Sequence, residues 1–365
     1  MPLKLDSSSA GGLFARRIAV TLAALFVYRL AAAIPLPGVD TSALQGAAVR
    51  YASLTHMSIM ALGVMPYLSA LIVVEFAKMA WPRLRTWSQI PRNASRLDTG
   101  ILVGALLLAA LQAHGLAVAL EGMPGLVPDA DLGFRIGIAI SLIGATAFVI
   151  WIAGLITRHG IGSGLWILVA IPHLITLGSA MASTVEATTT GAAHPAALLL
   201  TPALLAAAVA VLTLITTSTP PLATHDEIVW TPILGATVGN WLFGAAMLLE
   251  WTLNPDVYGG VAPSLVSLHG YLLAFLAGVA LVTFLRRRSL IESGGTFRAA
   301  AAVPLALALM AVIIAHEIAD EVPSAFAGAH MLQPSAHGIL VLAAVGLIVV
   351  EELKRMARAA ATRPS

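Results

Sequence analysis

Apolar runs of about the length of a membrane-spanning helix recur along the whole chain, separated by mostly short connections. A spanning helix needs about 20 mostly apolar residues, and several of the runs reach that length. The pattern predicts ten transmembrane helices and an all-α fold. The predicted spans cover residues 16–34, 57–79, 99–119, 135–156, 162–182, 195–216, 230–252, 267–286, 299–317 and 337–352.

Two connections depart from this pattern. Residues 35–56 are too weakly apolar to span a membrane and too long for a tight turn. They either return into the helix bundle as a short re-entrant segment, which needs protein or water around it, or form an exterior loop. Residues 318–336 are acidic and rich in small residues, which favours an exterior loop.

The composition favours a polytopic membrane protein. Of the 365 residues, 59% are hydrophobic and 10% are charged, whereas a soluble chain carries about a quarter charged residues. A chain this apolar cannot hide its surface from water. Cysteine is absent, which excludes disulfides, thiolate nucleophiles and Cys-ligated metal sites.

Basic residues are distributed unevenly over the predicted connections, and this bias sets the orientation of the chain. With a cytoplasmic amino terminus, the cytoplasmic connections and ends hold all of the 20 Lys and Arg residues except Arg29, Arg50 and Arg135. An even number of spans places both termini on one side. We therefore expect both termini in the cytoplasm, and the Ala-rich composition with basic cytoplasmic loops suits a bacterial inner (plasma) membrane.

The second predicted span carries residues that a plain lipid-facing helix does not need, namely Gly63, Pro66, Tyr67, Ser69 and Glu75. Gly63 and Pro66 weaken the helix near its start, where neighbours or water must supply the lost backbone hydrogen bond. Such a helix belongs inside a bundle, beside a cavity. A Pro-kinked packing helix is the alternative, because Gly and Pro are common in membrane helices.

Candidate catalytic and metal-binding residues are sparse. Glu75 is either a proton or cation site or an interfacial residue, solvated or paired with Lys78 or Arg83. No His pair with a spacing of four residues is joined by a third ligand, so no metal and no other cofactor is expected. Ser163 lacks the base and the orienting acid of a serine nucleophile site. No catalytic residue is predicted, and the chain is not expected to be an enzyme.

Three motifs resemble the SecY family, the central subunit of the protein-conducting channel. Residues 16–44, RRIAVTLAALFVYRLAAAIPLPGVDTSAL, resemble its first span, with Tyr-Arg late in the span and an I-P-x-P-G exit. Residues 61–71, ALGVMPYLSAL, resemble its second span. Residues 151–164, WIAGLITRHGIGSG, resemble the end of its fourth span and the start of its fifth. The motifs occur in the family's order and cover the first half of the chain closely, whereas the second half is similar mainly in span count.

The resemblance implies a SecY-like clamshell of ten helices in two inverted five-helix halves. Spans 1–5 would occupy residues 1–190 and spans 6–10 residues 191–365. An hourglass pore between the halves would be plugged by a short segment within residues 38–52. A ring of apolar side chains would seal its waist, since apolar constrictions gate by dewetting. A lateral gate lined by spans two, three, seven and eight would let apolar segments pass into lipid.

The family's functional positions carry over to particular residues of this chain. The pore ring falls on Val64, Leu68, Leu165, Val169, Thr237 and Leu340. Val64 and Leu68 are four residues apart and therefore share one helix face, and the same holds for Leu165 and Val169. Thr237 would be a polar intrusion, and Val238 replaces it if the alignment is off by one. The lateral-gate motif is Gly63, Pro66, Tyr67 and Ser69, and the motif between spans four and five is Thr157, Gly160, Gly162 and Gly164.

The chain departs from the family in its cytoplasmic connections, which are reduced. The family's connections between spans six and seven and between spans eight and nine are long basic hairpins that dock the ribosome or the SecA motor. Here residues 217–229 contain no Lys or Arg, and residues 287–298 are basic but too short to project far. A connection without bases cannot hold RNA phosphates. We therefore expect no nucleic-acid partner, and the usual docking of SecA or the ribosome is in doubt.

The resemblance implies a short, divergent channel subunit that translocates secretory proteins across the membrane or inserts membrane proteins into it. Its implied partners are the lipid bilayer, the translocating polypeptide and SecE-like and SecG-like small subunits. Two other functions remain open. One is a secondary transporter of small solutes, which needs intramembrane acids, of which Glu75 is the only one away from the end of a span. The other is a non-conducting membrane protein that keeps the fold.

Overall fold

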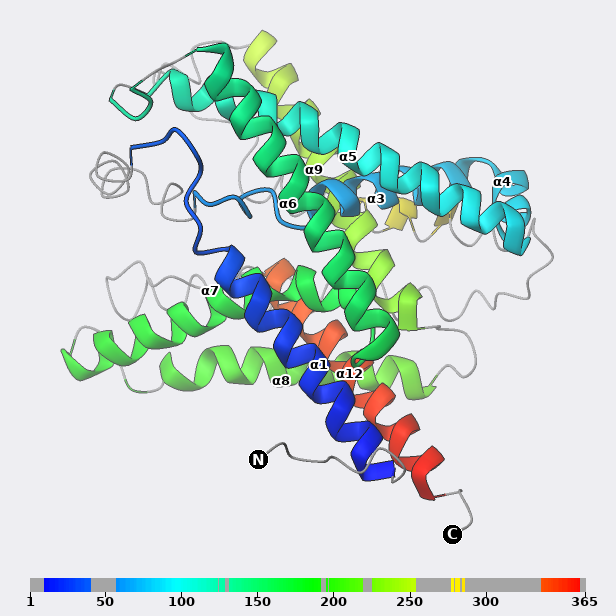
Figure 1. Cartoon of the computed structure of the whole chain (residues 1–365). Coiled ribbons are helices and arrows are strands. Elements are labelled where there is room, and N and C mark those ends of the chain that lie inside the picture. Colours follow the sequence, from blue (N-terminus) through cyan, green and yellow to red (C-terminus); the bar gives the residue numbers. More distant parts are fainter. Residues whose placement is uncertain are drawn as a thin grey trace, which may run out of the picture. The chain divides into compact units, whose positions relative to one another are not determined.

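The computed structural model consists almost entirely of helices in the part of the chain that it describes (Figure 1). The described residues are 10–40, 57–123, 125–128, 131–191, 195, 197–218, 225–253, 277–278, 280–282, 284–285 and 336–361. Helices in this part are α1 (Ala10–Ala31), α3 (Met65–Ala80), α4 (Pro82–Ser88), α5 (Pro91–Glu121), α6 (Leu132–His159), α7 (Gly164–Thr189), α8 (Ala197–Ser218), α9 (His225–Leu253) and α12 (Ala336–Ala361).

The all-α prediction is confirmed for the described residues. Three of the described helices, α5, α6 and α7, are long and apolar enough to cross a membrane by length and composition. α1, α8, α9 and α12 coincide with further predicted spans, and the described residues of the predicted span 267–286 are helical. The predicted span 299–317, the predicted loop 287–298 and all but the last residue of the predicted loop 318–336 lie outside the described residues.

The chain divides into two compact units, each of which is described by itself. The first unit comprises Met1–Ala77, Trp87–Val169 and Glu351–Ser365, and the second comprises Lys78–Thr86 and Ala170–Val350. The first unit holds α1, α5, α6 and most of α3, together with the end of α12. The motifs around Gly63 and Gly160, like the motif at residues 16–44, fall within it.

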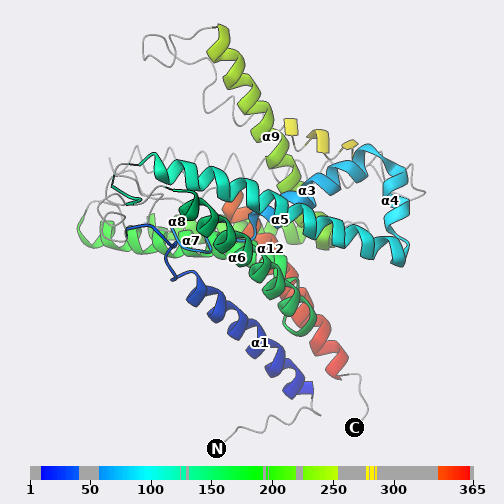
Figure 2. The same cartoon turned by 45° about the horizontal axis from the view of Figure 1, so that its top comes forward.

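Within the first unit, α5 packs closely against α6, and α1 also contacts α6 (Figures 1 and 2). One face of α5 carries four fully buried alanines at intervals of four residues: Ala105, Ala109, Ala113 and Ala117. α6 buries larger side chains, among them Ile138, Leu142 and Val149. Small residues let helix backbones approach closely, which is the usual means of packing helices in lipid. This pair therefore contributes much of the buried core of the first unit.

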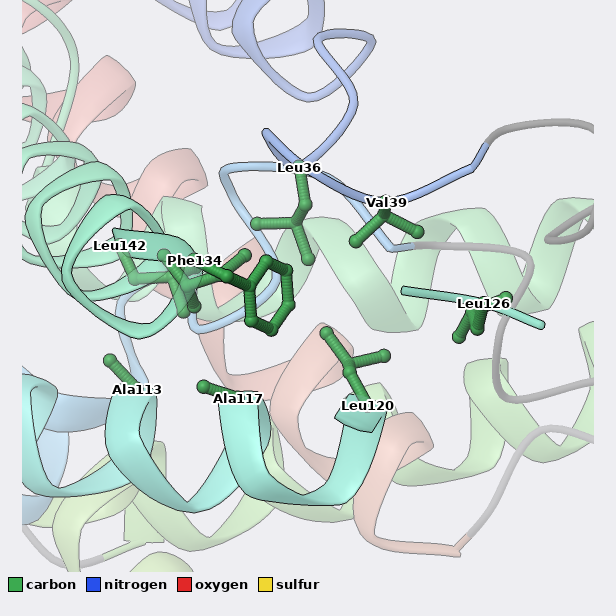
Figure 3. Close-up of a cluster of buried hydrophobic side chains, with 9 residues drawn as sticks. Leu36, Val39, Ala113, Ala117, Leu120, Leu126, Phe134 and Leu142 are labelled. Carbon is green, nitrogen blue, oxygen red and sulfur yellow. The ribbon is translucent and has the colours of Figure 1, made fainter. Parts of the chain in front are cut away.

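The chain that leaves α1 is packed onto the ends of α5 and α6. We call residues 32–40 the strap. Pro35 forms an isolated antiparallel β-bridge with Ser58, and the Asp40 backbone N–H donates to the Leu126 carbonyl at 3.0 Å. Figure 3 shows Leu36 and Val39 of the strap turned toward Phe134 of α6, in a cluster that includes Leu120 and Leu126.

Glycine is required where the strap crosses Phe134. Gly38 has a positive φ of 76°, and a Cβ added there would lie 2.8 Å from the Phe134 ring. Residues 35–40, the first part of the predicted connection 35–56, belong to the strap. They contain a bridge residue and a turn, and they pack against the apolar cluster. Residues 41–56, which contain most of the predicted plug at 38–52, lie outside the described part.

Candidate functional site: the start of α3 and the turn between α6 and α7

The second predicted span begins later than expected. Residues 57–64 form turns and a bridge, and α3 starts at Met65, so the prediction of a continuous helix over 57–79 is wrong at its amino-terminal end. Gly63 adopts a positive φ of 52°, which a helix cannot contain. Pro66 sits in the first turn of α3, where its missing N–H costs no helical hydrogen bond. Gly63 and Pro66 thus define a helix start rather than a weakness inside a helix.

The two predicted ring residues at this helix start point into the protein. Val64 is 6% exposed and Leu68 is 4% exposed, and the Leu68 backbone N–H donates to the Val64 carbonyl at 3.0 Å. Because they are one helical turn apart, both side chains lie on the same face. Met65, between them, is 55% exposed. Val64 and Leu68 are therefore buried on one side of the helix start, and their place in a pore ring stays a prediction.

The other motif residues of this region have separate roles. The Gly63 backbone N–H donates to the Met60 carbonyl at 2.8 Å, and the Tyr28 hydroxyl lies 3.9 Å from where a Cβ on Gly63 would stand. Tyr67 packs against the apolar cluster formed by α3 and α5. Ser69 is partly buried, and Glu75 is partly buried and engaged in an interaction.

The hydroxyl of Thr157 bridges the turn between α6 and α7. Thr157 Oγ1 donates to the Ala153 carbonyl at 2.8 Å within α6 and accepts from the Gly164 backbone N–H at 2.9 Å. Gly164 is the first residue of α7, so this hydroxyl joins the last turn of one helix to the first turn of the next. The hydroxyl therefore caps the start of α7, whose first N–H groups have no acceptor in their own helix, while its bond to Ala153 stays within α6.

The glycines of this turn meet backbone at short range. A Cβ on Gly164 would overlap the Ala153 carbonyl, and a Cβ on Gly160 would lie 2.8 Å from the Ile156 carbonyl. Gly162 has a positive φ of 67°. All three positions exclude a larger residue for steric or conformational reasons. The motif that sequence analysis identified is thus a tight helix-to-helix connection.

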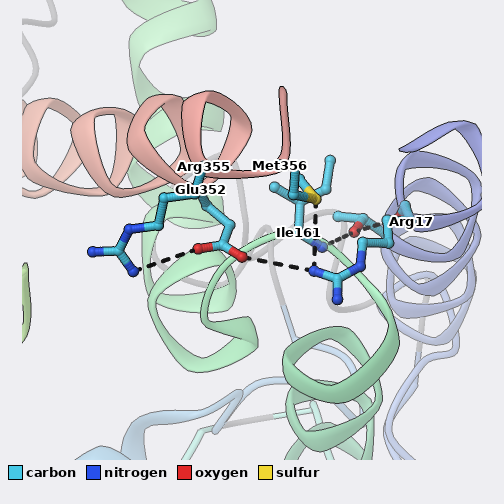
Figure 4. A network of polar contacts seen from close by, with 6 residues as sticks. Arg17, Ile161, Glu352, Arg355 and Met356 are labelled. Carbon is cyan, nitrogen blue, oxygen red and sulfur yellow. Dashed lines mark hydrogen bonds and ion pairs between the residues drawn. The ribbon is translucent and has the colours of Figure 1, made fainter. Parts of the chain in front are cut away.

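Two residues that sequence analysis did not single out tie this turn to α1 and α12. Thr21 Oγ1 in α1 accepts from the Ile161 backbone N–H at 3.0 Å and donates to the Arg17 carbonyl. Arg17 Nη1 lies 3.6 Å from Glu352 Oε1 and 3.6 Å from Met356 Sδ, both on α12 (Figure 4). In the sequence, these contacts were indicated only by a threonine and an arginine four residues apart at the edge of an apolar run.

The remaining predicted ring residues are described less completely. On α7, Leu165 is partly buried and Val169 is 7% exposed, and both belong to the first unit with Val64 and Leu68. In the second unit, Thr237 is partly buried, whereas its neighbour Val238 is 9% exposed. Leu340 has helical backbone, and its side chain lies outside the described part. The choice between Thr237 and Val238 stays a prediction.

The opposite end of α6 is charged. Arg135 forms a two-pronged contact with Glu121, with Arg135 Nη2 2.6 Å from Glu121 Oε2 and Arg135 Nε 2.8 Å from Glu121 Oε1. Glu121 is the last residue of α5, two residues beyond the apolar run 99–119. The hydrogen bond from Arg135 lowers the pKa of Glu121 below its ordinary value of 4.5. Asp131 caps α6 by accepting from the Phe134 backbone N–H at 2.8 Å.

The side chains of the two motif regions therefore pack helices together and present apolar surface. Aliphatic side chains on two helices can seal a passage against water but cannot transfer protons or bind a metal. Among the described residues, no group of three or more His, Asp or Glu side chains is placed to hold a metal ion. The polar groups near the α6–α7 turn are used to hold helices together.

Comparison with known proteins agrees with these motifs. The family model of SecY matches residues 58–220, which contain both motif regions. The chain is 32% identical over 199 residues to the protein translocase subunit SecY of Buchnera aphidicola from Acyrthosiphon pisum, covering 49% of this chain and 45% of that protein. It is 32% identical over 210 residues to the same subunit of Escherichia coli K12, covering 52% of this chain and 47% of that protein. The chain thus matches about half the length of these curated relatives.

Solved structures extend the likeness of fold to nearly the whole chain. A SecY structure from a study of the plug domain and the closed channel superposes with a TM-score of 0.57 at 12% identity, over 95% of this chain and 93% of that one. Sec61 from a canine ribosome–channel complex superposes with a TM-score of 0.55 at 14% identity, over the same shares. At such identities the likeness concerns the fold alone. The chain is thus similar to SecY in sequence over residues 58–220 and similar in fold to solved SecY and Sec61 channels over nearly its whole length.

Proposed function

We propose that this chain is a protein-conducting channel subunit that moves secretory proteins across the membrane or inserts membrane proteins into it. The observation that carries the proposal is the inward-facing aliphatic pair at the start of α3, Val64 and Leu68, within the SecY match and in the same compact unit as Leu165 and Val169. A yielding apolar ring closes around a passing chain without offering it a binding site. The relatives' name, protein translocase subunit, supports the same activity.

The proposed architecture has ten spans in two inverted halves, residues 1–190 and 191–365. Thr237 and Leu340 complete the ring from the second half, with Val238 as the alternative to Thr237. Gly63, Pro66, Tyr67 and Ser69 belong to the lateral gate. This arrangement is supported by the fold of the solved channels that the chain resembles.

The proposed setting is a bacterial inner membrane with both termini in the cytoplasm, as the distribution of Lys and Arg indicates. The proposed partners are the translocating polypeptide and SecE-like and SecG-like small subunits. Residues 217–229 carry no Lys or Arg, so ribosome or SecA docking through that connection is not part of the proposal.

Ion conductance tests the ring directly. Val64→Asn and Leu165→Asn replace aliphatic ring side chains with wettable ones and are expected to raise the leak conductance of the protein reconstituted in planar bilayers. Val73→Asn on α3 is the matched control, because Val73 is 60% exposed and faces away from the protein interior. Unchanged conductance in both ring variants would contradict the pore assignment.

A second measurement separates translocation from the two alternatives. A photo-crosslinking residue at Leu68 should capture a secretory or membrane-protein chain arrested during translocation. Capture at Leu68 but not at Val73 supports the channel. Uptake of a small solute without any captured chain favours a secondary transporter, and neither activity favours a member of the fold that has lost conduction.

A further inference from the structure

A chain of polar contacts joins α1 to two other segments of the first unit (Figure 4). The Ile161 backbone N–H, in the α6–α7 turn, donates to Thr21 Oγ1, and the Thr21 hydroxyl donates to the Arg17 carbonyl, each at 3.0 Å. The Arg17 side chain reaches α12, where its Nη1 lies 3.6 Å from Glu352 Oε1 and 3.6 Å from Met356 Sδ. The end of α12 belongs to the first unit, as α1 does, so all of these contacts lie inside one compact unit.

The two sides of this chain of contacts differ in how easily they break. Thr21 and Ile161 are each 8% exposed, so the hydrogen bond between them is buried. A buried N–H that loses its acceptor is costly, which keeps α1 and the turn together. The Arg17 and Glu352 side chains are instead 42% and 30% exposed. Exposed ion pairs contribute little to stability and are screened by salt, so the contact with α12 is the one that can break and form again.

The side chains of α12 are arranged so that this contact can be exchanged. α1 packs along α6, and the contacts described between α1 and α12 are made by side chains. Glu352 and Met356 are four residues apart and share the face of α12 that Arg17 touches. Arg355, on the same helix, has its Nη1 3.9 Å from Glu352 Oε2. Glu352 therefore keeps a cationic partner on its own helix when Arg17 leaves, which makes the separation of α1 from α12 less costly.

Both segments that α1 contacts lead to residues of the proposed ring. Leu165 follows Ile161 by four residues, and Leu340 lies on α12, twelve residues before Glu352. We propose that the contact of Arg17 with Glu352 is a latch, which holds the end of α12 against α1 and opens when the ring widens around a polypeptide. This inference rests on the proposed channel function. Arg17 is then a positioning residue, which acts on the ring through α12 and does not touch the passing chain.

The latch can be tested by a distance measurement, because the chain has no cysteine of its own. Nitroxides on Phe14→Cys in α1 and Lys354→Cys in α12, both exposed positions, report the separation of the two helix ends by double electron–electron resonance. The sample is the full chain in phosphatidylcholine vesicles. We expect Arg17→Gln and Glu352→Gln to raise the population at longer distances about threefold, the effect of losing one exposed ion pair. Unchanged distances in both variants would overturn the proposal.

Two comparisons separate a latch from a general loss of structure. Arg355→Gln removes the other arginine beside Glu352 and leaves the contact with α1, so its distances should match those of the natural chain. Raising the salt concentration to about 1 M, where charges are screened beyond about 3 Å, should lengthen the distances in the natural chain but not in Arg17→Gln. Equal changes in Arg355→Gln and Arg17→Gln, or a salt effect of the same size in Arg17→Gln, would overturn the assignment of the latch.

Leak conductance in planar bilayers shows whether the latch acts on the channel. Arg17→Gln should raise the leak about threefold, in step with its longer distances, and Arg355→Gln should leave it unchanged. A rise in Val64→Asn without a rise in Arg17→Gln would leave the channel in place and overturn the latch. Longer distances in Arg17→Gln with no change of leak in any variant, Val64→Asn included, would instead overturn the proposed function, and with it the connection from the latch to the ring.

Discussion

The two ends of α6 are held in place by different forces. At the start of α6, the strap and the end of α5 meet Phe134 in an apolar cluster whose leucines are almost fully buried. At its end, the α6–α7 turn depends on two threonine hydroxyls and on glycines that meet backbone. Burying one leucine stabilises by about 1.5–3 kcal/mol, whereas a hydrogen bond contributes about 1 kcal/mol net. We therefore expect the start of α6 to depend mainly on its apolar cluster, and the turn mainly on its hydrogen bonds and on the close approach of its glycines.

Removing the central aromatic ring should have the largest effect on stability. Phe134→Ala leaves a cavity under Gly38 and between the strap and α5, at an expected cost of about 3 kcal/mol. The free energy of unfolding in detergent measures this. Phe26→Ala, at a position on α1 that is 64% exposed, should cost far less. Similar losses in the two variants would show that the cluster does not hold this end.

Adding one methyl group at the α6–α7 turn should have the second-largest effect on stability. Gly164→Ala places a Cβ against the Ala153 backbone, which cannot move without shifting α6. We expect a loss of about 2 kcal/mol, within the range for overpacking. Gly154→Ala on α6 is the control, because a Cβ there meets nothing within 4 Å. If Gly164→Ala unfolds at the same denaturant concentration as Gly154→Ala, the close approach is not required.

Losing the hydroxyl of Thr21 should have a smaller effect. Thr21→Val keeps the shape of the side chain but leaves the buried Ile161 backbone N–H without its acceptor, at a cost of about 1–2 kcal/mol. Faster amide hydrogen exchange at Ile161 would report the loss directly. Thr176→Val is the comparison, since the Thr176 hydroxyl bonds only to the Pro172 carbonyl of its own helix among the contacts described. Unchanged exchange at Ile161 would mean that water or another group replaces Thr21.

The ion pair of Glu121 and Arg135 should give the smallest effect, and one that depends on pH. The folded-state pKa of Glu121 lies below 4.5, so the pair stabilises the protein above that pH, and the contribution disappears as the pH falls through the lowered pKa. Unfolding midpoints between pH 3 and pH 7 should fall more steeply on the acid side for the natural chain than for Glu121→Gln. Parallel curves would contradict the assignment.

The sequence by itself determined the membrane character, the all-α class and the two motif regions. Apolar runs and the scarcity of charge set the first two, since lipid admits only structures that satisfy their own backbone hydrogen bonds. The motifs were recognisable because Gly63, Pro66 and Gly160 occupy positions where backbone geometry leaves few other choices. Such constraints are local and therefore visible in a linear sequence.

The tertiary structure decided what those residues contact. The helix start at Met65 depends on a left-handed glycine, whereas the apolar pattern alone continues smoothly from residue 57 to residue 79. The links from Thr21 to Ile161 and from Arg17 to Glu352 join positions far apart in the sequence. The periodicity of the sequence does not predict such pairs. A single polar contact depends on how two distant helices pack, and not on the neighbours of either residue in the sequence.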